Sequence, residues 1–352
     1  MKNTLTYIII ILSLIILFCN YTNIEYFNNN SFDFTKGKII KINNNNFNSF
    51  IYKINNIKNN KQFYQILKSN IGDTNEDNLI YEYYVGLYIN KFVNKFPCFI
   101  KTYNIFQYKN KDIWELFKNS YDLESNILNT SFNNINNIND LTCNNYIAIL
   151  LEYVNNYIPL KYKLLDTHFI KNELIFVLFQ IFFPLYTLNN TFSHNDINYN
   201  NILLQKAPDN KYINFHYILN DNFEINFKSQ YTVKIIDYGN TYFYENEYNN
   251  TLQLYELFCS KTECDNDCYK YSTTDYYKKH IIENYLIEDI ILYCNEQFFN
   301  NKNIIFLKTI TEHNINNIYN TLLLKLQKTT ISKHKTFQDI YIYQNGDDMK
   351  YI

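Results

Sequence analysis

The feature that most constrains this 352-residue chain is a pair of polar motifs, each joined to an apolar strand. Residues 193–204 read SHNDINYNNILL, so Asp196 and Asn201 stand five positions apart just before an apolar run. Further on, the apolar run VKII leads directly into Asp237, a tyrosine and a glycine. Short apolar runs bounded by polar residues are typical of buried strands, so the polar side chains are expected at strand ends.

The spacing of these residues suits phosphoryl transfer. One carboxylate, Asp196, would approach the acceptor hydroxyl, while the amide oxygen of Asn201 would turn back to hold a magnesium ion on the phosphates of ATP. Asp237 would be the principal ligand of that metal. The sequence therefore predicts ATP and Mg²⁺ as cofactors, with Asp196 as a catalytic residue and with Asn201 and Asp237 as metal ligands.

Apolar patterns elsewhere indicate mixed helices and strands. Residues 37–54 predict two strands around an Asn-rich turn, and residues 147–154 predict a buried strand. Residues 78–96 carry apolar side chains at helical spacing. Residues 174–188 are apolar but too short for a membrane span and contain Gln180 and Pro184, so a core helix is expected.

The polar motifs resemble those of the protein-kinase-like superfamily, which read H-R-D-x4-N and D-F-G. The resemblance implies that Phe50-Ile51-Tyr52-Lys53 corresponds to V-A-I-K. Lys53 would then be a catalytic residue that holds the α and β phosphates and pairs with Glu82. His194 would pack on the aromatic ring of the D-Y-G turn and fix the catalytic loop.

The same resemblance implies the rest of a nucleotide site. Leu151-Glu152-Tyr153-Val154 would form a hinge in which Glu152 and Val154 read adenine through backbone groups. Gly37 would be the one glycine that remains of a phosphate-covering loop. Asp289 would be a buried helix carboxylate that supports the catalytic loop.

Further segments resemble kinase-like proteins encoded by large (giant) DNA viruses, over roughly residues 37–242. These segments are YEYYVG at 81–86, PCF at 97–99, KYINFHYILND and FKSQYTVKIIDYG. That family has an extra hairpin between the metal-binding Asn and Asp, which would account for the 36 positions between Asn201 and Asp237.

The resemblance implies an α+β fold with two lobes. Residues 24–157 would form a small lobe of antiparallel sheet plus helix, with a polar insertion around 112–145. Residues 158–352 would form a larger, mainly helical lobe with a hairpin insertion around 205–232. Residues 1–23 would stand apart as a membrane anchor or signal segment.

Composition limits the partners. The formal charge is -2, which removes the case for a nucleic-acid protein based on a basic field. All 32 basic residues are Lys, so no side chain offers the planar bidentate fork of Arg.

Two further features of the composition carry little functional weight. The 61 Asn residues indicate an AT-rich genome more than a function. Cys259, Cys264 and Cys268 match no standard zinc spacing and are expected to be structural or incidental.

Residues 5–19, LTYIIIILSLIILFC, are apolar and follow Lys2. At 1.5 Å per residue such a helix reaches about 22 Å and needs flanking residues to cross a core of about 30 Å. No small-residue cleavage pattern follows, which favours an uncleaved single-pass anchor over a signal peptide. The expected location is therefore a host-cell or virion membrane, with the orientation left open.

Three functions remain open at this point. The first is a protein kinase, more in keeping with the Ser/Thr type, acting on a protein substrate. The second is a small-molecule kinase of choline-kinase or aminoglycoside-phosphotransferase type, because those enzymes have the loop sequence H-N-D, in which Asn195 takes the middle position here. Gly239 argues against this reading, since those enzymes usually have an acidic residue at that position. The third is a pseudokinase scaffold, favoured by the missing glycines and opposed by the retained polar residues.

Overall fold

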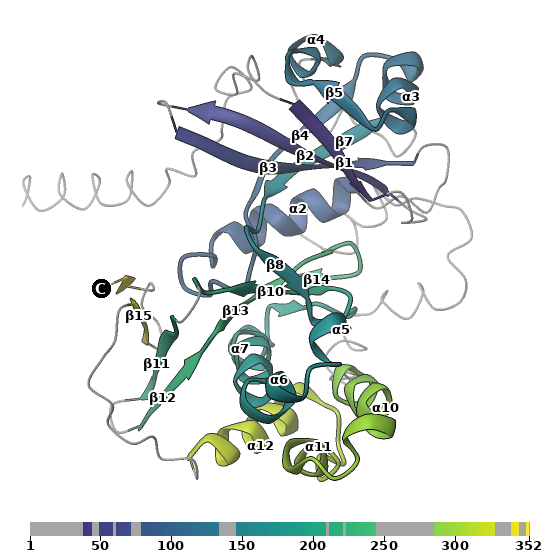
Figure 1. Ribbon diagram of the computed structural model, residues 1–352. Coiled ribbons are helices and arrows are strands. Elements are labelled where there is room, and N and C mark those ends of the chain that lie inside the picture. Colours follow the sequence, from purple (N-terminus) through teal and green to yellow (C-terminus); the bar gives the residue numbers. More distant parts are fainter. Residues whose placement is uncertain are drawn as a thin grey trace, which may run out of the picture.

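The computed structural model describes residues 38–43, 49–58, 61–71, 79–133, 146–208, 211–220, 223–243, 285–327, 339–344 and 350–351. The fold is α+β, with a curled antiparallel sheet and one long helix above a mainly helical part (Figure 1). The α+β class expected from the sequence is therefore confirmed.

The upper part is a seven-stranded antiparallel sheet in the order β5-β1-β2-β3-β7-β4-β6. Its strands are β1 (Lys38–Asn43), β2 (Ser49–Lys58), β3 (Lys61–Asn70), β4 (Thr102–Tyr108), β5 (Asp122–Glu124), β6 (Phe132–Asn133) and β7 (Ile147–Glu152). The pair β1 and β2 confirms the two strands predicted within residues 37–54, and β7 confirms the buried strand. The strand β3 was not predicted.

The register of β2 and β3 decides which lysines share a face of the sheet. Ile51 lies opposite Lys68, and Lys53 lies opposite Ile66. Directly opposed residues of an antiparallel pair point to the same side, and side chains alternate along a strand. Lys53 and Lys68 therefore lie on one face, while Phe50, Tyr52 and Ile54 point to the other.

That other face has its own apolar core. Trp114 and Phe117 of α3 (Lys111–Asn119) pack there against Phe50 and Tyr52. The structure here differs from the polar insertion expected around 112–145. The segment continues through β5, η2 (Ser125–Ile127), α4 (Leu128–Ser131) and β6, and both strands join the sheet. Buried aromatic residues in α3 outweigh its polar composition, while residues 134–145 lie outside the described residues.

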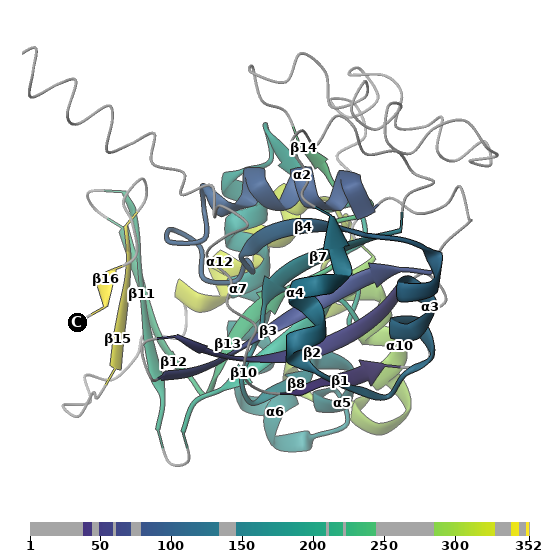
Figure 2. The same cartoon turned by 90° about the horizontal axis from the view of Figure 1, so that it is seen from above.

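Helix α2 (Leu79–Asn90) crosses the sheet on the face that carries Lys68, in agreement with the helix predicted within 78–96 (Figure 2). Its end is tied to β4 because the Asn90 side chain donates to the Thr102 carbonyl at 2.6 Å and accepts from the Thr102 amide at 3.0 Å. Gly86 lies directly against the Thr102 side chain, and a Cβ at this position would overlap it. The close approach of helix and sheet therefore requires glycine.

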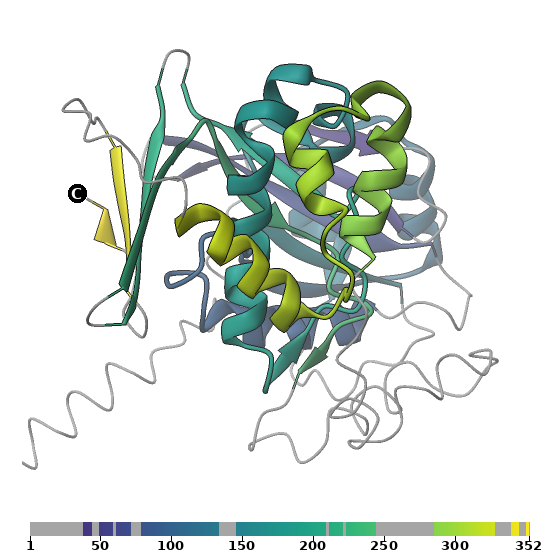
Figure 3. The same ribbon diagram turned by 90° about the horizontal axis from the view of Figure 1, so that it is seen from below.

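The lower part is mainly helical. Its helices are α5 (Leu160–Lys163), α6 (Thr167–Asn172), α7 (Leu174–Thr187), α10 (Leu286–Phe298), α11 (Lys302–Leu307) and α12 (Ile315–Gln327). Short strands β8 (Tyr157–Pro159), β10 (Ile202–Lys206) and β13 (Tyr231–Ile235) form a second sheet above them, and β9 (Phe192–Ser193) pairs with β14 (Tyr242–Phe243). Figure 3 shows α7 with α12 and the α10–α11 pair beside it.

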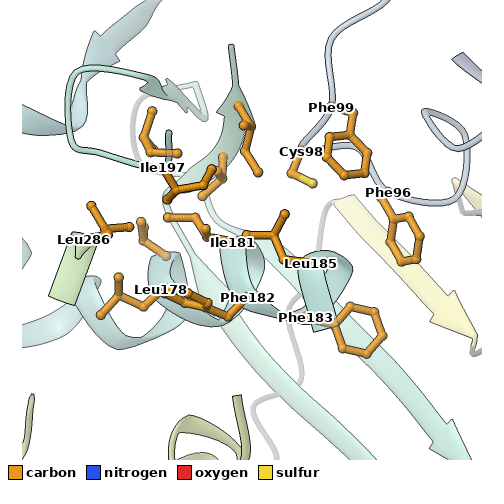
Figure 4. Packing of buried hydrophobic residues seen from close by; sticks show 14 of the residues in the cluster. Phe96, Cys98, Phe99, Leu178, Ile181, Phe182, Phe183, Leu185, Ile197 and Leu286 are labelled. Atoms are coloured by element: carbon orange, nitrogen blue, oxygen red, sulfur yellow. The ribbon is translucent and has the colours of Figure 1, made fainter. Parts of the chain in front are cut away.

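Helix α7 is the core helix predicted from residues 174–188. Leu178, Ile181, Phe182 and Leu185 of this helix lie in one buried cluster with Leu286 of α10 (Figure 4). Its polar residue is satisfied, because the Gln180 amide donates to the Tyr231 carbonyl at 3.0 Å and accepts from the Val233 amide at 3.1 Å. The side chain that argued against a membrane span therefore fixes β13 onto the helix.

A long hairpin stands beside α7 (Figures 2 and 3). It consists of β11 (Ile213–Asn220) and β12 (Phe223–Ser229), within the region where an insertion was expected, and β15 (Asp339–Gln344) and β16 (Lys350–Tyr351) extend it. Phe227 stacks on Phe176 with ring centroids 4.7 Å apart. At the base, buried Glu173 accepts from the Ser229 hydroxyl at 2.7 Å and the Gln230 amide at 3.2 Å.

The apolar run at residues 5–19 lies outside the described residues, as do Cys259, Cys264 and Cys268. Among the helices that the structure does describe, none has the length and apolar character needed to cross a membrane.

Gly86→Ala should destabilise the protein by roughly 1–3 kcal/mol, because the added methyl group forces α2 away from Thr102. Helix propensity alone predicts the opposite sign, a gain of about 1 kcal/mol. Urea unfolding at constant slope measures the change. A variant as stable as the wild type, or more stable, would show that helix and strand can separate without cost.

Candidate functional site

The centre of the site is the Lys68 ammonium group, which joins three parts of the fold. Its Nζ atom lies 2.7 Å from Glu82 Oε2 of α2 and 2.9 Å from Asp237 Oδ1, two residues beyond β13. The Glu82 side chain is 3% exposed, whereas that of Asp237 is 46% exposed. The buried carboxylate therefore anchors the lysine, and the open one faces the space beside the sheet.

Electrostatics favour the charged forms of Lys68 and Asp237. Burial works against a charged Lys68, but the carboxylates of Asp237 and Glu82 outweigh it and raise the pKa of Lys68. The nearby Lys68 charge in turn lowers the pKa of Asp237, against a smaller opposing effect of burial. The result is a fixed positive charge beside a fixed, accessible carboxylate.

The structure corrects the expected role of Lys53. Its Nζ atom lies 3.1 Å from the Tyr153 hydroxyl, and it stands over the rings of Tyr64 and Tyr153 at 3.9 and 4.2 Å from their centroids. Glu82 pairs with Lys68 instead. The register explains this, because Lys53 and Lys68 share a face but belong to different strands, and α2 lies against the end of β3 that carries Lys68.

Residues 193–201 form a tight loop around the Asp196 carboxylate. The Asn201 amide donates to Asp196 Oδ2 at 2.9 Å and to the Asp196 carbonyl at 3.0 Å, and the Asn198 amide donates to Oδ1 at 2.9 Å. Ile197, between them, lies in the buried cluster beside Ile181 (Figure 4). The carboxylate is thus oriented by two amides, and the Asn201 side-chain oxygen remains as an acceptor for a cation.

The loop is fixed to the segment that carries Asp237. His194 Nε2 lies 3.1 Å from the Ile236 carbonyl, and its ring meets the Tyr238 ring edge-on at 5.7 Å, so the expected packing of His194 is confirmed. Burial lowers the pKa of His194 although Asp237 and Asp196 pull the other way. A neutral imidazole therefore holds the two polar segments together.

Tyr238 and Tyr81 link this segment to the upper sheet. The buried Tyr238 hydroxyl donates to the Ile235 carbonyl and accepts from the Ile100 amide, both at 3.1 Å. The Tyr81 hydroxyl of α2 donates to the Thr241 carbonyl at 2.6 Å. Both ends of the Asp237 segment are therefore held by residues of the upper part.

The segment expected to read adenine is only partly available. The Glu152 amide donates to the Lys101 carbonyl at 2.8 Å, and its carboxylate accepts from the Lys101 amide at 3.0 Å and Lys234 Nζ at 2.9 Å. Glu152 therefore cannot offer its backbone N–H to a base, because that group already serves the sheet. Val154 lies after the end of β7, outside the strand ladder.

A cavity of about 180 Å³ lies beside the loop, between it and α10. His194, Asn195, Asp196 and Asp289 are among its lining residues. Among the described residues, His194 Nδ1 and Asn195 Nδ2 are buried polar atoms without a hydrogen-bond partner. Burial and the neighbouring Glu288 raise the pKa of Asp289. Asp289 thus lines the same cavity as the loop, but it is half-buried, whereas a buried carboxylate was expected.

Sequence reasoning missed Lys68, although Ile66 stands two positions before it, as Ile51 stands two positions before Lys53. The available signal was distance along the chain, since Glu82 follows Lys68 by 14 positions. Gly37 lies outside the described residues. In the described part of the chain, no group of three or more His, Cys, Asp or Glu side chains gathers as a metal site.

Comparison with known proteins adds no family to this geometry. No protein-family model matches the chain, and no curated protein matches it.

Lys68→Met should destabilise the protein by roughly 3–5 kcal/mol, because it removes the ammonium group that pairs with the buried Glu82 carboxylate. Lys53→Met is the matched control and should cost about 1 kcal/mol or less, the value of a partly exposed cation–π contact. Denaturant unfolding of both variants measures the difference. Equal losses would mean that Lys68 is not the structural partner of Glu82.

The lowered pKa of His194 predicts a pH-dependent stability. An unfolded histidine titrates near 6.5, and the folded one resists protonation, so its contribution is complete above that pH and is lost as the pH falls below it. His194→Asn should flatten the fall in unfolding free energy between about pH 6.5 and 5. His168→Asn, on exposed α6, should keep the wild-type slope. Parallel slopes for all three proteins would contradict this assignment.

Proposed function

We propose that this chain is an ATP- and magnesium-dependent kinase of the protein-kinase-like superfamily, which transfers the γ-phosphoryl group to a protein hydroxyl, more in keeping with the Ser/Thr type. The observation that carries the proposal is the pairing of Lys68 with buried Glu82 and accessible Asp237, next to a loop that orients Asp196. In this reading, the sheet with α2 is the small lobe and the helical part is the large one.

The donor set fits a magnesium nucleotide. Asp237 and the side-chain oxygen of Asn201 are hard oxygen ligands, and magnesium at such sites takes one or two carboxylates, with water and phosphate oxygens supplying the rest. Lys68 takes the phosphate-holding role that the sequence assigned to Lys53. A bound magnesium nucleotide would supply the transferable phosphoryl group and neutralise its charge.

The chain's own residues would orient and deprotonate the acceptor. The amides of Asn198 and Asn201 hold the Asp196 carboxylate in one orientation, ready to accept the proton of an incoming hydroxyl. Glu82 keeps Lys68 in place from below, so the ammonium group can face phosphates without losing its anchor. His194 keeps the Asp196 and Asp237 segments at a fixed separation.

The test is phosphoryl transfer by the full-length chain with labelled ATP, magnesium and mixed protein or metabolite acceptors. Asp196→Asn should lower transfer by orders of magnitude while magnesium-ATP still stabilises the protein. Asp237→Ala should remove most of that stabilisation, about 2.7 kcal/mol at one hundred times the dissociation constant. Asp112→Asn, an exposed change on α3, is the control and should match the wild type.

Each outcome separates the functions left open by the sequence. Label on metabolites and not on proteins would favour a small-molecule kinase. Magnesium-ATP binding without any transfer would favour a pseudokinase. The absence of both binding and transfer would overturn the nucleotide site altogether.

A further inference from the structure

A second cavity, of about 330 Å³, lies on the far side of Glu152, where the upper sheet meets the hairpin. Its walls come from the α2–β4 connection and from β4, β7, β10, β11 and β13. The lining residues that bear on ligand binding are Pro97, Phe99, Lys101, Tyr103, Glu152, Gln205, Phe215 and Lys234. None of the lining residues is Lys68, Glu82 or Asp237, and none belongs to the 193–201 loop. The cavity is therefore a separate site, and its volume falls within the range of small-molecule pockets.

The cavity wall contains a buried ion pair. Lys234 Nζ lies 2.9 Å from Glu152 Oε1 and 3.4 Å from the Phe99 carbonyl, and its side chain is 11% exposed. An ammonium group has three donors, and these two contacts use two of them. The other Glu152 oxygen is occupied by the Lys101 amide at 3.0 Å. Both Glu152 oxygens are thus engaged, whereas these contacts use only two of the three Lys234 donors.

The charges around the cavity do not cancel. Lys101 lines it as a second ammonium group, at an exposed position, while Glu152 is the one acidic residue among the lining side chains of this cavity. Tyr103 adds a phenol that stays protonated, because burial and the nearby Glu152 charge raise its pKa to about 12. The polar side of the cavity therefore offers donors and an excess of one positive charge.

Apolar side chains complete the lining of the cavity. Pro97 is half-buried there, and Phe99 and Phe215 are fully buried aromatic residues of the same lining. An apolar lining of this kind takes an apolar group, and a nearby cation suits an anionic substituent on it.

We propose that this cavity is a binding site for a small ligand with an apolar body and one carboxylate-like anionic head, held by Lys101 and Lys234. The proposal does not rest on the kinase function, since Lys68, Glu82, Asp237 and the 193–201 loop do not line this cavity. Occupancy would touch Lys234, three positions before Asp237, and Glu152, at the end of β7. The site therefore adjoins the two strands that lead into the candidate nucleotide site.

Two probes of equal shape test the charge requirement, namely 2-naphthoate and its neutral counterpart 2-naphthamide. Calorimetric titration of the full-length chain with each probe should give naphthoate a dissociation constant at least fivefold lower than that of naphthamide. Lys101→Gln should remove that preference while naphthamide binding persists. Lys171→Gln, at an exposed position of α6, should keep it.

A third variant tests the location. Gln205 lines the cavity and is partly exposed, so Gln205→Trp should fill the space and exclude both probes. Equal binding of the two probes, an unchanged preference in Lys101→Gln, or full binding by Gln205→Trp would each overturn the proposal. No binding of either probe to the wild type would do the same.

Discussion

The pairing of Lys68 with Glu82 and Asp237 is the interaction on which the rest of the site depends. It joins a central strand of the upper sheet, the helix that crosses it and the segment that follows β13. A buried carboxylate such as Glu82 is tolerable only with a partner. Because Glu82 must reach Lys68, the rotation of α2 about its own axis and its distance from the sheet are both set. Gly86 then allows the helix to lie close to β4. The same ion pair therefore determines both the geometry of the site and the packing of α2 on the sheet.

Tyrosine hydroxyls do much of the bridging between elements in this Arg-free chain. Tyr238 and Tyr81 connect the Asp237 segment to the upper part through backbone groups, and the Tyr52 hydroxyl lies between the Phe117 and Ser120 carbonyls, to one of which it donates. A buried tyrosine contributes a large apolar surface and one polar atom that needs a partner. Each such hydroxyl therefore adds a directional hydrogen bond to the non-directional apolar packing of the core.

The sequence revealed the elements whose patterns are strong and local. The apolar run of α7 was correctly predicted as a helix, and the H-x-D-x4-N segment lies directly before strand β10, as the apolar run after it predicted. Lys53 was wrongly paired with Glu82 because β2 and β3 each carry an Ile two positions before a Lys, and only their register shows which lysine meets α2. The cavity beside Glu152 was not foreseen, since its walls come from strands distant in sequence.

Two backbone conformations show how firmly the polar segments are held. Asn195 and Asp237 have φ of 56° and 67°, in the left-handed region that glycine occupies at little cost. Asn and Asp tolerate this region better than other side chains, yet a loop with no task for its side chains would gain from glycine at either position. At Asp237, the ion pair between its carboxylate and Lys68 offsets the cost of the left-handed backbone. The His194 contact with the Ile236 carbonyl holds the preceding residue in place. The strain therefore belongs to the site, because it is present where the carboxylate must point toward the lysine.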